Sequence, residues 1–331
     1  MAGMRRHGKR RERMFMVTAI VILALAAACV VGGDATYACI THRRLRAWEA
    51  RVERDPDGVR KGCREFSVGE GPTALLLIHG FGESPAAYAK IAPALAARGF
   101  ACRAMRLPGS AEPMAQFSQT SLAKWREAVD REIKALRASH GQVWVVGHSL
   151  GGAIALDYVL NHPGAVDGVV LLAPLVQVSG RRSPLLSPRA WHRVAEVILH
   201  RSDMLENIMP VDARDPALKR YDLLDRFIPR AVHRGVFDLA RTNAPRAADL
   251  QVPLLLILPK ADAVTDNAAS RRFFAAAGSR SKTLVVLENS GHMVPLDLDR
   301  DRAVAAIDGF VRDPGAFAAA AASGAGPPGP R

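Results

Sequence analysis

The sequence has 331 residues, 49% of them hydrophobic, and this length favours one large α/β domain over two once both ends are set aside. Its formal net charge of +13 gathers near the N-terminus and in one region after residue 180, which argues against a nucleic-acid-binding face. Four cysteines (Cys29, Cys39, Cys63 and Cys102) are too few and too irregularly spaced for a disulfide framework or a metal site.

The N-terminal region has the pattern of a membrane segment. Residues 1–13 contain six Lys or Arg and one Glu, and residues 14–33 contain no charged residue. Twenty helical residues are about 30 Å long, the thickness of the bilayer's hydrocarbon core. The basic leader places the N-terminus in the cytoplasm and the rest of the chain on the other side. Two alternatives to an uncleaved anchor are a cleaved secretory signal and lipidation at Cys29, which follows three alanines as in a bacterial lipobox.

Residues 34–63 read as a charged connector between the membrane segment and the folded domain. The connector is partly helical in pattern and ends near a turn signal at Asp55-Pro56-Asp57-Gly58. We expect the domain to span 64–313 and the Ala/Gly/Pro-rich residues 314–331 to be disordered. Export of this domain makes a Cys63–Cys102 disulfide an alternative to two buried thiols.

Within the domain, apolar runs alternate with helical patterns. Expected strands are 64–68, 74–78, 101–107, 143–146, 169–172, 253–258 and 284–287, and expected helices are 86–97, 122–136, 151–160 and 299–311. Strands that are apolar on both faces and joined by helices predict a mostly parallel sheet covered on both sides. The alternation stops over 178–250, an Arg-rich, Pro-punctuated region that reads as an inserted helical lid.

One serine follows a buried strand at a turn that contains glycines on both sides. The run Val143 to Val146 ends in Gly147-His148-Ser149-Leu150-Gly151, the Gly-x-Ser-x-Gly pattern of a nucleophile elbow. Ser149 is therefore the candidate nucleophile. The main-chain N–H of Leu150, together with that of Phe81 in the Gly-rich turn after residues 74–78, is predicted to form an oxyanion hole.

A serine hydroxyl needs a base, and the base needs an orienting acid. His292 follows the last strand and is the candidate base. Asp262 ends the strand before it and is the candidate acid, with Asp266 as its rival. Glu288 precedes the histidine loop, which suggests packing or exposure to solvent.

These motifs, in this order, resemble the α/β-hydrolase superfamily, closest to its lysophospholipase, monoacylglycerol lipase and serine aminopeptidase group. The resemblance covers roughly residues 64–311 and implies an α/β-hydrolase fold with a Ser-His-Asp triad. It also implies hydrolysis of carboxylic esters, plausibly of acyl lipids, through an acyl-enzyme and without a metal or organic cofactor. One departure is Pro108-Gly109-Ser110, where many relatives have Pro-Gly-His-Gly; this difference bears on substrate choice.

Two further functions remain open at this stage. The same triad would serve an aminopeptidase or a thioesterase, because the acyl-enzyme route is shared. A non-catalytic binding protein of this fold is a third reading, although such proteins usually lack a triad residue. The expected partners are a small acyl ester or lipid and the membrane, and the sequence does not indicate an oligomeric state.

Overall fold

Long apolar runs form one central sheet in the computed structural model, which describes residues 2–183 and 185–323. Over these residues the sheet has seven strands in the order β1-β3-β2-β4-β5-β8-β9. The strands are β1 (Phe66–Val68), β2 (Thr73–Ile78), β3 (Ala101–Met105), β4 (Gln142–His148), β5 (Gly168–Leu172), β8 (Leu254–Pro259) and β9 (Lys282–Leu287). Only the β1–β3 pair is antiparallel among these strands. The mostly parallel α/β sheet expected from the sequence is confirmed.

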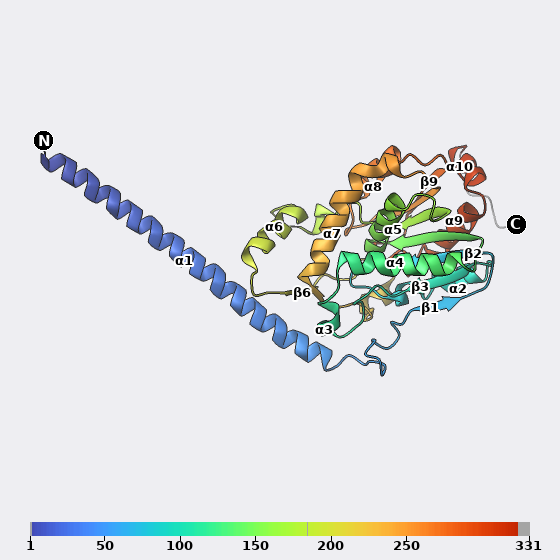
Figure 1. Cartoon of the computed structure of the whole chain (residues 1–331), viewed down its shortest axis with the longest axis horizontal. Coiled ribbons are helices and arrows are strands. Elements are labelled where there is room, and N and C mark those ends of the chain that lie inside the picture. The colour runs from blue at the N-terminus through green and yellow to red at the C-terminus, as the bar shows by residue number, and fades with distance from the viewer. Residues whose placement is uncertain (1, 184, 324–331) are drawn as a thin grey trace.

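Helices cover both faces of this sheet (Figure 1). Along β2, Leu76 and Ile78 pack in one hydrophobic cluster while Leu75 and Leu77 pack in the other, because successive side chains of a strand point to opposite faces. The first cluster includes residues of α4 (Leu122–Arg137), α5 (Leu150–Asn161), α7 (Arg230–Asn243) and α8 (Asn267–Ala276). The second includes residues of α2 (Ile91–Ala96), α9 (Arg300–Arg312) and α10 (Pro314–Ala322). Short segments complete the connections: η1 (Pro85–Tyr88), α3 (Met114–Phe117), η2 (Gly180–Arg182), η3 (Pro216–Arg220) and η4 (Ala244–Asp249).

The helix predicted over 86–97 is divided in the structure. Residues Pro85–Tyr88 form the 3-10 helix η1, and α2 begins only at Ile91. Pro93 lies in the first turn of α2, where its missing N–H leaves no intrahelical bond unmade. The proline is therefore compatible with a helix that starts at residue 91 and unfavourable in the interior of a longer one.

The lid is inserted between β5 and β8. Besides α7 and the short segments η2, η3 and η4, it contains α6 (Pro188–Ile198) and an antiparallel pair formed by β6 (Met204–Glu206) and β7 (Phe227–Pro229). Helix α6 begins at the N-cap Ser187, whose hydroxyl accepts a hydrogen bond from Ala190 N–H. The β6–β7 pair adds a small sheet to a lid that the sequence predicted as helical.

The N-terminus forms one long helix, α1 (Ala2–Glu49), that projects from the domain (Figure 1). The part from Met14 onward is long and apolar enough to cross a membrane, and residues 14–33 are exposed. The helix does not stop at residue 33. Its second half runs along the lid, where Ala38 and Leu45 are buried.

The structure decides between the two readings of Cys63 and Cys102 and changes the expectation for the C-terminal tail. Cys63 and Cys102 are free buried thiols, so the alternative of a disulfide between them is not realised. The tail was expected to be disordered from residue 314, but Pro314–Ala322 form α10. Phe317 is buried with its ring centroid 5.8 Å from that of Phe310, which supplies the apolar burial that composition did not suggest. Residues 324–331 of that predicted tail lie outside the described residues.

Candidate active site

Ser149 lies at the sharp turn between β4 and α5. Its φ of +52° and ψ of −116° belong to a region that non-glycine residues rarely adopt, at a cost of about 1–3 kcal/mol. The turn is held by two main-chain hydrogen bonds, from Ser149 N–H to Leu172 O and from Leu175 N–H to Ser149 O. The backbone is therefore kept in a strained conformation by its neighbours on the sheet, and the hydroxyl projects toward His292.

Gly151 lets α5 pass directly over the end of β2. A Cβ atom at this position would overlap the main-chain carbonyls of Ile78 and His79. We expect Gly151→Ala to force these segments apart, to destabilise the protein by about 1–3 kcal/mol and to lower the midpoint of thermal unfolding by roughly 2–12 °C. Gly180→Ala is the control, because a Cβ there meets no atom within 4 Å. Equal unfolding midpoints for the two variants would contradict the steric argument.

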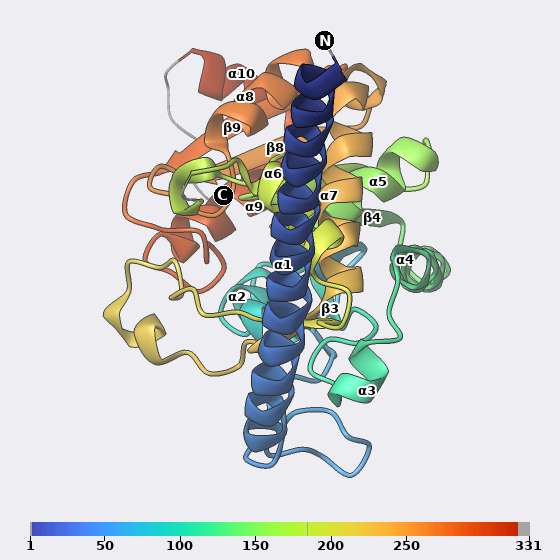
Figure 2. The same ribbon diagram turned by 90° about the vertical axis from the view of Figure 1, so that its left-hand side faces the viewer.

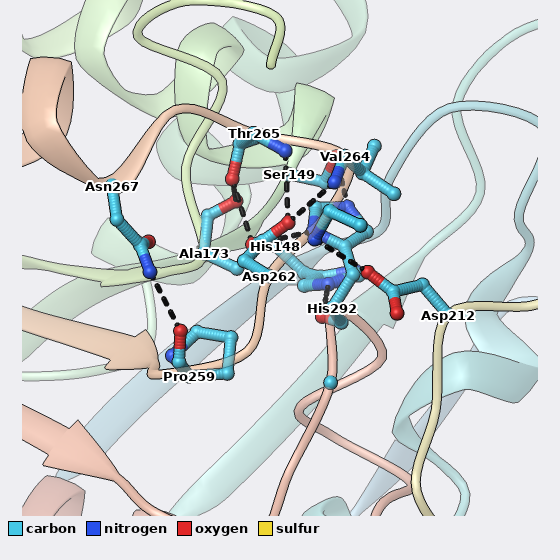
Figure 3. A network of polar contacts seen from close by, with 12 residues as sticks. His148, Ser149, Ala173, Asp212, Pro259, Asp262, Val264, Thr265, Asn267 and His292 are labelled. Atoms are coloured by element: carbon cyan, nitrogen blue, oxygen red, sulfur yellow. Dashed lines mark hydrogen bonds and ion pairs between the residues drawn. The ribbon is translucent and has the colours of Figure 1, made fainter. Parts of the chain in front are cut away.

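His292 lies between Ser149 and Asp262 (Figure 3). Its Nε2 is 2.9 Å from Ser149 Oγ, and its Nδ1 is 2.9 Å from Asp262 Oδ2. All three side chains are buried. The sequence placed these residues after β4, β8 and β9, and the parallel sheet brings the three strand ends to one edge. The arrangement supports proton transfer from the serine hydroxyl to an imidazole oriented by a carboxylate.

Asp262 is held as a carboxylate by donors on both oxygens. Oδ1 accepts the main-chain N–H groups of Val264 and Thr265 at 2.7 and 2.8 Å, and Oδ2 accepts the Thr265 hydroxyl at 2.8 Å. Burial raises the pKa of this carboxyl, but the charge and hydrogen bond of His292 and the two main-chain donors outweigh it and lower the pKa to about 2. The acid therefore stays ionised at neutral pH.

The other candidate acid, Asp266, caps a helix. It is the N-cap of α8, and its Oδ1 accepts the N–H groups of Ala268 and Ala269. The other excluded acid, Glu288, forms an exposed ion pair with Lys260 at 2.7 Å. The geometry therefore brings Asp262, and neither of these two carboxylates, to His292.

The pKa of His292 is raised above its ordinary value. Burial opposes the charged imidazolium, but the Asp262 carboxylate and its hydrogen bond more than compensate. Because catalysis needs the neutral imidazole, activity should be lost as the pH falls through this raised pKa.

We therefore expect kcat/KM for a soluble ester to rise with pH along an acid limb whose midpoint lies above about 6.5, the ordinary histidine value. The measurement is the initial rate at low substrate from about pH 5 to pH 9 in constant ionic strength. A midpoint well below that of a free histidine would mean that the carboxylate does not control His292.

Phe81 and Leu150 lie where the oxyanion hole was predicted. Phe81 follows β2 and Gly80, and Leu150 is the first residue of α5. In the described chain neither main-chain N–H has a protein acceptor. A free N–H group at the helix start after Ser149 and another in a turn that lines the same cavity are suited to an oxyanion.

A buried Glu83–His148 pair behind the triad was not foreseen. Glu83 Oε2 accepts the N–H of Gly80 at 2.8 Å and lies 2.9 Å from His148 Nδ1, while His148 Nε2 lies 2.8 Å from the main-chain O of His292. The pair connects the turn after β2, the turn that bears Ser149 and the loop that bears His292. The available sequence signals were a histidine within the elbow itself and a single acid in the turn after Gly82.

A cavity of about 320 Å³ opens over Ser149 and His292. Its wall is formed by the turn after β2, the loop after β5, the lid and the loops that bear Asp262 and His292. The lining residues are Phe81, Glu83, Ser149, Val178, Ser179, Arg182, Ser183, Pro188, Asn207, Met209, Pro210, Val211, Asp212, Leu224, Ala263, Val264, His292 and Met293. The lining is largely apolar, which fits an acyl chain.

The chain is similar to known proteins over most of its folded domain. The model of the family described as serine aminopeptidase, S33, matches residues 70–299. The chain is 24% identical to the thermostable monoacylglycerol lipase of Bacillus sp. (strain H-257), covering 73% of this chain and 91% of that lipase. The crystal structure of Paleococcus ferrophilus monoacylglycerol lipase matches with a TM-score of 0.66 at 25% identity, covering 76% of this chain and 98% of that one. The crystal structure of a membrane phospholipase A, a bacterial virulence factor, shares the fold with a TM-score of 0.53 at 22% identity, covering 91% of this chain and 99% of that one.

Proposed function

Because this chain belongs to the serine aminopeptidase (S33) family of α/β-hydrolases, we propose that it is a membrane-anchored lipase that cleaves monoacylglycerol-like esters with Ser149, His292 and Asp262. Its relatives include monoacylglycerol lipases, and the chain is an ester-cleaving serine hydrolase. The observation that supports the triad most directly is the pair of 2.9 Å contacts of His292 with Ser149 Oγ and Asp262 Oδ2.

The reaction follows from these contacts. His292 Nε2 takes the proton of Ser149 as Oγ attacks the ester carbonyl, and the N–H groups of Phe81 and Leu150 bind the oxyanion. One such donor is worth about 3 kcal/mol in the transition state of comparable hydrolases. His292 then returns the proton to the departing alcohol. Water, deprotonated by the same imidazole, releases the acid from Ser149.

The cavity favours an acyl ester over an aminoacyl amide. A peptide's free α-ammonium needs an unpaired carboxylate, and the lining has two carboxylates, Glu83 and Asp212. Glu83 is paired with His148, whereas Asp212 accepts Ala263 N–H and lies 3.5 Å from Arg182. Both acids are already engaged, so the apolar remainder of the wall governs binding.

Helix α1 is proposed to be a retained anchor with the N-terminus in the cytoplasm and the catalytic domain outside it. The basic residues before the apolar run support this orientation. Retention is supported by the second half of α1, which packs on the lid through buried Ala38 and Leu45 and continues the same helix. A cleaved signal or lipidation at Cys29 would instead free this segment from residues 14–28.

The function is tested by assaying the full-length protein in detergent on a monoacylglycerol, a short p-nitrophenyl ester, an acyl thioester and an aminoacyl p-nitroanilide. We expect both oxygen esters to be cleaved much faster than the anilide. Faster cleavage of the anilide would favour an aminopeptidase, and faster cleavage of the thioester a thioesterase. Failure of a fluorophosphonate probe to label the protein would favour a non-catalytic member of the fold.

A further inference from the structure

A buried carboxylate on the proposed membrane helix adds a hydrogen-bonded contact with the lid to the packing of Ala38 and Leu45. Asp34 lies on α1 directly after the apolar residues 14–33, and it is only 4% exposed. Its carboxylate accepts the main-chain N–H groups of His200, Arg201 and Ser202 at 2.9, 2.7 and 3.2 Å and the Ser202 hydroxyl at 2.6 Å. This set of four hydrogen bonds is called the Asp34 contact below. Hydrogen bonds to a charged acceptor are stronger than those between neutral groups.

The loop that Asp34 binds is fixed from its other side as well. Residues 199–203 connect α6 to β6, and Arg230 at the start of α7 donates from Nη1 to the main-chain O of Leu199 and of Ser202. Asp34 thus binds the loop's donors while Arg230 binds its acceptors. The loop has little freedom to move unless one of these partners is lost.

The loop leads directly to the wall of the cavity. After β6 the chain passes through Asn207 and Met209 to Asp212, all of which line the cavity over Ser149. Asp212 in turn accepts the N–H of Ala263, the residue after Asp262, and its main-chain O accepts the N–H of Met293, the residue after His292. The loop that Asp34 binds thus continues into a stretch of cavity wall that Asp212 holds to the acid and base loops by contacts of its own.

The Asp34 contact also lies at the level where the helix would leave the bilayer. Gly32 and Gly33 immediately precede it, and consecutive glycines weaken a helix by roughly 1 kcal/mol each relative to alanine. Without a contact just beyond them, the domain could swing about this point. The contact removes that freedom at the place where the helix itself is weakest.

Exposed apolar side chains flank the bound loop along the sequence of the lid. Val197 is 72% exposed shortly before the bound loop, Ile208 is 75% exposed shortly after it, and Leu185 is 95% exposed before α6. Helix α6 lies on the side of the domain that faces α1 (Figures 1 and 2). We take the bilayer as the partner of these side chains, because α6, which carries Val197, contacts α1, and the uncharged run of α1 ends at residue 33.

We propose that Asp34 is a positioning residue that fixes the lid to the membrane helix and thereby holds the cavity entrance against the bilayer, where a glycerolipid can enter. This inference rests on the proposed function and adds that the substrate is taken from the membrane. A water-soluble ester, which reaches the cavity from solution, does not depend on the contact. Loss of the Asp34 contact should therefore slow hydrolysis of a membrane-borne ester and leave hydrolysis of a water-soluble ester nearly unchanged.

The test uses the full-length protein in phosphatidylcholine vesicles, with monooleoylglycerol in the bilayer or p-nitrophenyl butyrate in solution as substrate. Asp34→Asn keeps the side chain's size but removes its charge and turns one acceptor into a donor facing N–H groups. We expect its rate on monooleoylglycerol to fall about tenfold while kcat/KM for the butyrate stays within about twofold. Ser202→Ala, which removes one of the four hydrogen bonds, should lower the rate on monooleoylglycerol by about two- to threefold.

Asp203→Asn is the matched control, because Asp203 is an exposed acid at the same interface, 3.2 Å from His42. Labelling of Ser149 by a soluble fluorophosphonate checks that each variant is folded. Unchanged monooleoylglycerol hydrolysis in Asp34→Asn would overturn the inference, as would an equal loss on both substrates with slower labelling, which would mean that Asp34 serves folding only. If the unaltered protein cleaves neither ester, the proposed function is wrong and the inference falls with it.

Discussion

Replacement of Ser149 by alanine is expected to lower kcat for ester hydrolysis by about 10⁴–10⁶-fold. The change removes Ser149 Oγ, which lies 2.9 Å from His292 Nε2 and is the atom that would attack the ester. Without it no acyl-enzyme forms. The measurement is the rate of p-nitrophenyl butyrate hydrolysis together with fluorophosphonate labelling. Residual activity should come from the oxyanion donors and substrate binding alone.

A measurement of thermal stability distinguishes loss of the nucleophile from misfolding of the variant. One hydrogen bond of Ser149 is worth about 1 kcal/mol, so the thermal midpoint of Ser149→Ala should move by only a few degrees. Ser67→Ala, on the edge strand β1, is the control and should retain full activity. Turnover by Ser149→Ala at a rate near that of Ser67→Ala would refute the assignment of the nucleophile.

The second large effect is expected at Asp262. Asp262→Asn keeps the shape of the side chain but puts a neutral amide beside His292 Nδ1, which removes the charge that stabilises the imidazolium and favours the wrong tautomer. We expect kcat to fall about 10⁴-fold, as in other triads. The acid limb of the residual activity should also move to lower pH, because the carboxylate raises the pKa of His292.

Asp266→Asn is the matched control, four residues further along the same loop. Its side chain caps α8, and asparagine caps a helix about as well as aspartate, so neither stability nor activity should change by more than a small factor. A loss of activity in Asp266→Asn comparable to that in Asp262→Asn would mean that the two acids have been assigned the wrong way round.

Local chemistry explains why much of the site was predictable. The strand before Ser149 and the glycines around it reflect short-range sterics, since only small residues allow the close passage of β2 and α5. His292 and Asp262 follow strands whose order implies parallel pairing, and parallel strands end at one edge of a sheet. The helix that starts after Asp266 was not predicted, although an acid before Asn267-Ala268-Ala269 is a usual N-cap.

Other features depend on segments that are far apart in the sequence. Glu83 and His148 are 65 residues apart, and Asp34 and Ser202 are 168 apart, so no local pattern announces either pair. The tail shows the same limit, because composition described residues 314–322 as disordered while Phe317 packs on Phe310 of α9. Burial against a distant partner outweighs local preference in such segments.

The amino-acid sequence by itself therefore determined the α/β class, the apolar N-terminal segment and the candidate nucleophile, acid and base, because each follows from periodicity, length or a turn that a few neighbouring residues dictate. Only the tertiary structure decided which of two nearby acids faces His292 and how the lid walls the cavity. It alone also joined the N-terminal helix α1 to that lid. These outcomes depend on hydrogen bonds and packing between distant segments, whose energies exist only once the chain has folded.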